Sequence, residues 1–215
     1  MENLSITAML TIATGIISLL CLLLLHFTSP EFKPGWRMVS EYALGKNKKT
    51  LTIFFLLWGA ASILSACLLW NITTSNWGRL GAALVFITGI GAIFGGLFDV
   101  KHKLHGLAFF LGVPFFPIGA LLLSYNLIKN ESWSNHQTPI LISAHLTWIG
   151  LVLMASSMIL LFSGFKKAGV AFGPNTDPPD NLPGGVIGIN GYANRFLIIC
   201  YIAWLIVIAK TYLSF

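Results

Sequence analysis

The chain has 215 residues, of which 56% are hydrophobic and 9% are charged. A water-soluble domain carries about 25% charged residues, so this composition excludes a soluble fold and predicts a surface that faces lipid. The net charge of +6 does not indicate nucleic-acid binding. The basic residues lie between apolar runs, where they meet lipid phosphates or set the membrane topology.

Six apolar segments are long enough to cross a bilayer, which requires about 20 residues in a helix. They are residues 6–27, 50–70, 79–98, 104–127, 139–164 and 194–213. Because the hydrocarbon core offers the backbone no water, each segment is expected to be helical. The predicted fold class is therefore all-α, a polytopic membrane protein whose residues 1–215 form one bundle of six transmembrane helices. The first segment lacks a basic flank and a small-residue cleavage site, so we expect it to be retained.

The basic residues are distributed unequally between the two ends of the predicted bundle. Ten of the thirteen lie in or beside the first, third and fifth connections, and three lie on the opposite side. By the positive-inside rule, this count predicts that the odd-numbered connections face the cytoplasm. The fifth connection, residues 165–193, is rich in Gly and Pro, and we expect either a lid over the bundle or an exposed loop.

The third connection contains a possible metal site. If residues 99–105 were helical, Asp99, His102 and His105 would share one face, and a carboxylate with two imidazoles suits zinc or iron. The alternative is a charged turn at the membrane surface, anchored by Lys101 and Lys103. The spacing alone does not distinguish these two structures.

Ionisable residues of the other odd-numbered connections lie at the same end. Glu41 can pair with Arg37 one helical turn earlier, or with Arg195, which opens the sixth helix. These positions allow one polar mouth at this end of the bundle, shared by Glu41, Asp99, His105 and Arg195.

Other histidines point to no cofactor. His145 is expected near the opposite surface, hydrogen-bonded to a neighbouring helix. His26 and His105 are the only loose candidates for a bis-histidine haem, and both lie near a helix end, so haem is not expected. We predict no cofactor, with zinc or iron at the third connection as the alternative.

Glycine and proline mark two of the central helices. Gly91 and Gly95 form a small-xxx-small face suited to a partner helix. Pro114 and Pro117 must free backbone carbonyls and bend the fourth helix. No hydrolase, metalloprotease or nucleotide-binding motif is present, so the sequence does not indicate an enzyme.

Three patches carry a family resemblance. They are V-S-E-Y-A-L-G at 39–45, G-L-F-D-V-K-H-K-L-H-G at 96–106, and residues 191–212, which include Arg195 and Trp204. At these residues, and over most of its length, the chain resembles the bacterial membrane family called domain of unknown function 998. The resemblance implies that the protein lies in the bacterial cytoplasmic membrane. It also implies a site that includes Ser40, Glu41, Asp99, His105, Gly106 and Arg195.

The chain also departs from the family pattern. No proline precedes Asp99, and Phe109 stands where the pattern has a second histidine, which counts against a metal site. The resemblance implies that the odd-numbered connections lie outside the cell, opposite to the charge count, so we leave the orientation open.

These observations lead to three hypotheses about function. The first is binding of a membrane lipid or small amphiphile at a polar mouth formed by the first, third and fifth connections, with ligand-binding residues Ser40, Glu41, Asp99, His105 and Arg195. The second is a metal-dependent membrane hydrolase of a lipid amide or ester, with Asp99, His102 and His105 holding the metal and Glu41 as general base. The third is an accessory subunit that packs through Gly91 and Gly95.

Overall fold

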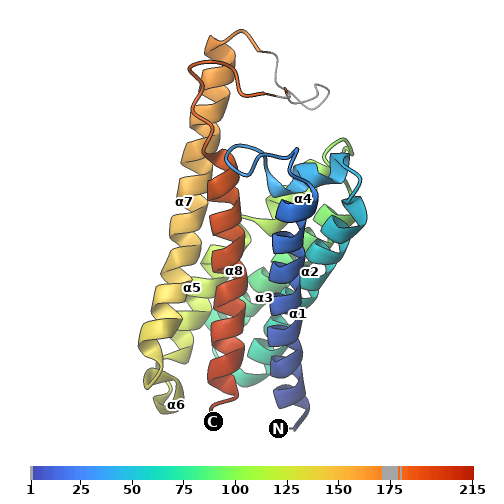
Figure 1. Cartoon of the computed structure of the whole chain (residues 1–215). Coiled ribbons are helices and arrows are strands. Elements are labelled where there is room, and N and C mark those ends of the chain that lie inside the picture. Colours follow the sequence, from blue (N-terminus) through green and yellow to red (C-terminus); the bar gives the residue numbers. More distant parts are fainter. Residues whose placement is uncertain (1, 171–178, 180) are drawn as a thin grey trace.

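A computed structural model describes residues 2–170, 179 and 181–215 of the chain, and these residues form helices and loops without a strand (Figure 1). The elements are α1 (Glu2–Thr28), the 3-10 helix η1 (Val39–Leu44), α2 (Lys48–Ile72), α3 (Asn76–Leu97), α4 (His105–Gly112), α5 (Phe115–Leu127), α6 (Glu131–Ser134), α7 (Gln137–Lys167) and α8 (Asn190–Tyr212). Among the described residues, six helical segments are long and apolar enough to cross a membrane, with α4 and α5 together forming the fourth. The predicted all-α bundle of six transmembrane helices is confirmed.

The two ends of the bundle differ. Both termini and α6 lie at one end, whereas η1 and the loops around it lie at the other, which we call the η1 end (Figure 1). Helix α7 has 31 residues. At 1.5 Å per residue, it is about 46 Å long and exceeds a hydrocarbon core of about 30 Å. It extends past the other helices at the η1 end (Figure 1). Lys166 and Lys167 lie in its last turn, where their positive charges interact favourably with the negative end of the helix dipole.

Glycines allow α3 to lie very close to its neighbours. A Cβ atom added to Gly59 of α2 would lie 2.8 Å from the carbonyl oxygen of Gly89 of α3. A Cβ atom on Gly91 would collide with the backbone of Gly112 at the end of α4. The Gly91 face is therefore in contact with α4 inside this chain, while Gly95 faces the ring of Phe55.

The fourth transmembrane segment is broken at Val113 and Pro114, between α4 and α5. Pro117 has no N–H, so the carbonyl group of Val113 cannot receive its usual helical hydrogen bond. The hydroxyl of Tyr201, in the centre of α8, donates to that carbonyl oxygen at 2.7 Å. The expected bend is confirmed, and a buried tyrosine satisfies the carbonyl that the proline frees.

Replacing Tyr201 by Phe should destabilise the bundle by about 1–2 kcal/mol, because the Val113 carbonyl would be left without a donor in a dry environment. The measurement is the thermal midpoint of the purified protein in mild detergent. Tyr192→Phe, on the exposed side of the same helix, serves as the control and should leave the midpoint unchanged. Equal midpoints for the two variants would contradict this account of the break.

Candidate functional site

The first connection folds back over the η1 end of the bundle. Its large side chains turn inward, and Phe32, Trp36, Val39 and Tyr42 are all buried. Residues 29–47 thus form a packed cover, which we call the roof, with η1 at its centre.

Arg195, in the first turns of α8, holds the roof in place. It is 6% exposed, and its guanidinium donates to the carbonyl oxygens of Pro34 at 3.3 Å and Arg37 at 2.7 Å. It also donates to the carbonyl of Gly191 at 2.9 Å, to the Tyr42 hydroxyl at 3.0 Å and to His26 Nε2 at 2.7 Å. These acceptors engage all three guanidinium nitrogens, which offsets the cost of burying the charge.

The tautomer of His26 follows from these contacts. Its Nε2 accepts from Arg195, and its Nδ1 lies 2.7 Å from the Leu22 carbonyl oxygen, which can only accept. His26 is therefore neutral, with its proton on Nδ1, and it ties the end of α1 to α8. The sequence indicated neither this role nor that of Tyr42.

Backbone contacts complete the attachment of the roof to α8. The Gly35 carbonyl accepts from the N–H groups of Gly191 at 2.8 Å and Tyr192 at 3.2 Å, which caps the start of the helix. A Cβ atom at Gly191 would strike the carbonyl oxygens of Pro34 and Arg37, so only glycine fits there.

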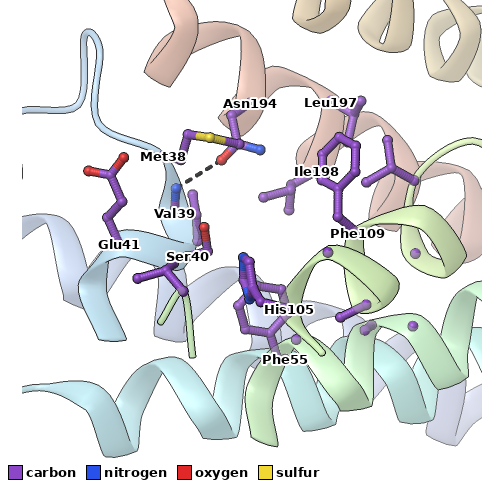
Figure 2. A pocket seen from close by; sticks show the side chains of 18 of the residues that line it. Met38, Val39, Ser40, Glu41, Phe55, His105, Phe109, Asn194, Leu197 and Ile198 are labelled. Carbon is purple, nitrogen blue, oxygen red and sulfur yellow. Dashed lines mark hydrogen bonds between the residues drawn. The ribbon is translucent and has the colours of Figure 1, made fainter. Parts of the chain in front are cut away.

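A cavity of about 830 Å³ lies beneath the roof. Helices α2, α3, α4, α7 and α8 form its walls together with η1. Most of its lining is apolar, including Phe55, Trp58, Phe109, Val113, Leu197 and Ile198. Its polar lining residues come from the η1 end: Ser40, Glu41, Lys101, His105 and Asn194. Figure 2 shows His105 and Ser40 on one side of this space and Asn194, Leu197 and Ile198 on the other.

The polar side chains of the cavity differ in how far they are engaged. Asn194 accepts from the backbone N–H of Val39 at 2.9 Å, which joins η1 to α8 (Figure 2). His105 Nδ1 lies 3.0 Å from the carbonyl oxygen of Phe98, so Nδ1 carries a proton, and in the neutral ring Nε2 is the acceptor. Within the described part of the chain, the Ser40 hydroxyl makes no hydrogen bond. The cavity therefore offers an imidazole acceptor and a hydroxyl.

Glu41 stands at the edge of the cavity, and Figure 2 shows its carboxylate turned away from His105. Its Oε2 forms an ion pair with Arg37 Nε at 3.0 Å, as expected for residues four apart, and Arg195 is engaged elsewhere. Burial raises the pKa of Glu41 above its ordinary value, and the Arg37 charge opposes that shift only in part. The Arg37 guanidinium also lies 4.8 Å from the ring of Trp36.

The third connection is a turn, so the helical face that would have aligned Asp99, His102 and His105 does not form. Helix α3 ends at Leu97, and the N–H groups of His102 and His105 bond back to the carbonyls of Asp99 and His102. Of these three side chains, only His105 lines the cavity. No group of three or more His, Cys, Asp or Glu side chains suited to a metal occurs among the described residues.

Asp99 and His102 have partners of their own at the surface. Asp99 Oδ2 accepts from Lys48 Nζ at 2.7 Å, and this hydrogen bond lowers the pKa of Asp99. His102 stacks on Phe98 with ring centroids 4.6 Å apart, and its Nδ1 accepts from the Leu104 N–H. Residues 99–105 therefore form a charged turn at the surface of the bundle.

The mouth expected from the sequence is only partly assembled. Ser40, Glu41 and His105 line one cavity, whereas Asp99 and Arg195 do not. In the fifth connection, Val186 packs with Trp36 of the roof and Phe165 of α7. The described residues 168–170, 179 and 181–189 are not in the cavity lining, and a lid formed by residues 171–178 and 180 lies outside the described residues.

Some features of the site left little signal in the sequence. Trp58, Met158 and Phe162 line the cavity, but apolar side chains in a transmembrane helix look alike whether they face lipid, core or cavity. Asn194 could have been noticed as a polar residue near the start of an apolar helix. At the opposite end, His145 Nε2 lies 3.0 Å from the Tyr125 hydroxyl of α5, as expected for a histidine bonded to a neighbouring helix.

The fold and the cavity define an integral membrane protein with a roofed cavity at one end of a six-helix bundle. A model of the family described as protein of unknown function (DUF998) matches residues 12–211, so the chain belongs to that family. Comparison with curated proteins and with solved structures gave no match.

The raised pKa of Glu41 makes a prediction about stability. A carboxyl group whose pKa is higher in the folded state contributes stability below its unfolded pKa, and this contribution is lost as the pH rises through the folded value. Raising the pH from about 4 to about 7 should therefore lower the thermal midpoint of the wild type more than that of Glu41→Gln.

The check is the difference between the two midpoints at each pH, which cancels the titration of all other groups. Arg37→Met should increase the loss, because the charge that opposes the burial of Glu41 is removed. Parallel curves for wild type and Glu41→Gln would contradict the assignment.

Proposed function

We propose that this protein binds one lipid or other small amphiphile in the cavity beneath the roof. The observation that carries the proposal is the cavity's division into an apolar body inside the transmembrane bundle and a polar end at η1. An amphiphile has the same division. The volume of about 830 Å³ lies within the range of about 300–1,000 Å³ that is usual for small-molecule sites.

The polar end is expected to decide which amphiphile binds. An acyl chain gains little by leaving lipid for an equally apolar cavity, so the chain contributes packing more than a hydrophobic driving force. Hydrogen bonds to the head group are then the main source of preference. Ser40 and the Nε2 lone pair of His105 support a head group that bears a hydroxyl or an amide N–H.

The sequence suggested Arg195 as a ligand-binding residue, but in this proposal it does not contact the ligand. Because its three guanidinium nitrogens donate to the roof, to His26 and to Gly191, we assign it the role of positioning η1 and not that of a partner for an anionic head group. The hydrolase and accessory-subunit hypotheses have less support, since Asp99 and His102 lie outside the cavity and Gly91 packs on α4.

Occupancy can be tested by filling the cavity without disturbing the fold. Gly106 lines the cavity, and a Cβ atom there would meet nothing within 4 Å. Gly106→Leu should fold normally and retain several-fold less lipid in native mass spectrometry of the mildly solubilised protein. Gly184→Leu is the matched control, because Gly184 also has open space but does not line the cavity. Equal lipid retention by the two variants would overturn the proposal.

The head-group contact can be tested separately at Ser40. Since its hydroxyl makes no hydrogen bond within the described part of the chain, Ser40→Ala should leave the thermal midpoint unchanged. Affinity for a monoacylglycerol should fall about fivefold to tenfold, as expected for one lost hydrogen bond of about 1 kcal/mol. The measurement is titration in lipid nanodiscs, and an unchanged affinity would exclude Ser40 from the site.

A further inference from the structure

Two aromatic side chains stand at the boundary between the cavity and the lipid-facing surface. Phe109 of α4 and Phe162 of α7 both line the cavity, yet they are 39% and 38% exposed. Both belong to helical segments that are long and apolar enough to cross a membrane. The cavity therefore opens at the surface of the bundle between α4 and α7.

The break in the fourth transmembrane segment explains why this boundary lies at the η1 end. Below the break, α5 packs against both α3 and α7, whereas α4 above the break packs mainly against α3. The contact between Gly91 and Gly112 holds the end of α4 against α3. Figure 2 shows Phe109 pointing from α4 towards Leu197 and Ile198 of α8.

The depth of the opening matches the outer part of one leaflet. Phe109 is the fifth residue of α4. It therefore lies about 6 Å from the start of that helix at 1.5 Å per residue. Ser40 and His105 lie at the η1 end of the same cavity. A lipid in this leaflet would have its head group near the polar lining and its chain beside the two aromatic rings.

We propose that the opening bounded by Phe109 and Phe162 is a lateral portal, through which a single-chain lipid passes between the cavity and the leaflet at the η1 end. This inference rests on the proposed function and adds the route and the class of ligand. A single chain fits a cavity of about 830 Å³, which lies near the upper limit of about 1,000 Å³ for one small molecule. The competing route runs from the aqueous side past the roof, where Leu44 of η1 lines the cavity and is 36% exposed.

The experiment measures how fast a probe reaches the cavity. Protein in phosphatidylcholine vesicles is mixed with lysophosphatidylcholine whose acyl chain carries bromine atoms, which quench tryptophan fluorescence on contact. Trp58 lines the cavity, and its signal is isolated by subtracting the trace of a Trp58→Phe partner made for each variant. Stopped-flow mixing gives the rate of quenching, and the final amplitude gives the occupancy.

Phe109→Ala and Phe162→Ala should each accelerate quenching about tenfold, because each removes a ring from the rim of the portal. Phe110→Ala is the matched control, since Phe110 is exposed on the same helix but does not line the cavity. Phe110→Ala and Leu44→Ala should leave the rate unchanged. Gly106→Trp adds bulk beside the portal where there is open space, and should slow quenching.

The outcomes separate the route from the binding itself. Acceleration by Leu44→Ala but not by Phe109→Ala or Phe162→Ala would overturn the portal in favour of entry past the roof. Rates that are equal in every variant, with quenching still reached at equilibrium, would also overturn the portal while leaving the proposed function intact. No quenching of Trp58 at equilibrium in the wild type would overturn both.

Discussion

The buried guanidinium of Arg195 is the interaction on which the η1 end of this protein depends. A charge in this position is tolerated only when its donors are satisfied, and the acceptors come from the roof, from α1 and from α8 itself. Because two of these acceptors are backbone carbonyls of residues 34–37, the first connection must run directly over the start of α8. The position of η1, and with it the polar end of the cavity, follows from this requirement.

A second constraint is the break in the fourth transmembrane segment, which shapes the wall of the cavity. Pro114 and Pro117 interrupt the fourth transmembrane segment, and Tyr201 compensates for the carbonyl that is freed. On one side of the interruption α4 packs mainly against α3, and on the other side α5 packs against both α3 and α7. Phe109 of α4 and Phe162 of α7 both line the cavity and are partly exposed, so the cavity is open between these two helices.

Local chemistry made part of the site predictable. The ion pair of Arg37 with Glu41 follows from their spacing of four residues, and the break in the fourth segment follows from its prolines. The grouping of Asp99 with His102 and His105 was conditional on a helix that does not form, because backbone hydrogen bonds close residues 99–105 into a turn. Arg195 was expected to face the mouth, but it donates to backbone carbonyl groups of the roof. The positions of backbone carbonyl groups cannot be predicted from the order of side chains in the sequence.

The sequence by itself determined that the chain is a membrane protein of six helices, because length and apolar composition decide which segments a bilayer accepts and lipid leaves the backbone no alternative to a helix. It also placed Ser40, Glu41 and His105 at one end of the bundle. Only the tertiary structure decided which of the polar residues at that end share a cavity. That outcome depends on how far each side chain is already satisfied by its neighbours: Arg195 and Asp99 are engaged by the roof and by Lys48, whereas the hydroxyl of Ser40 and Nε2 of His105 are left at the cavity wall.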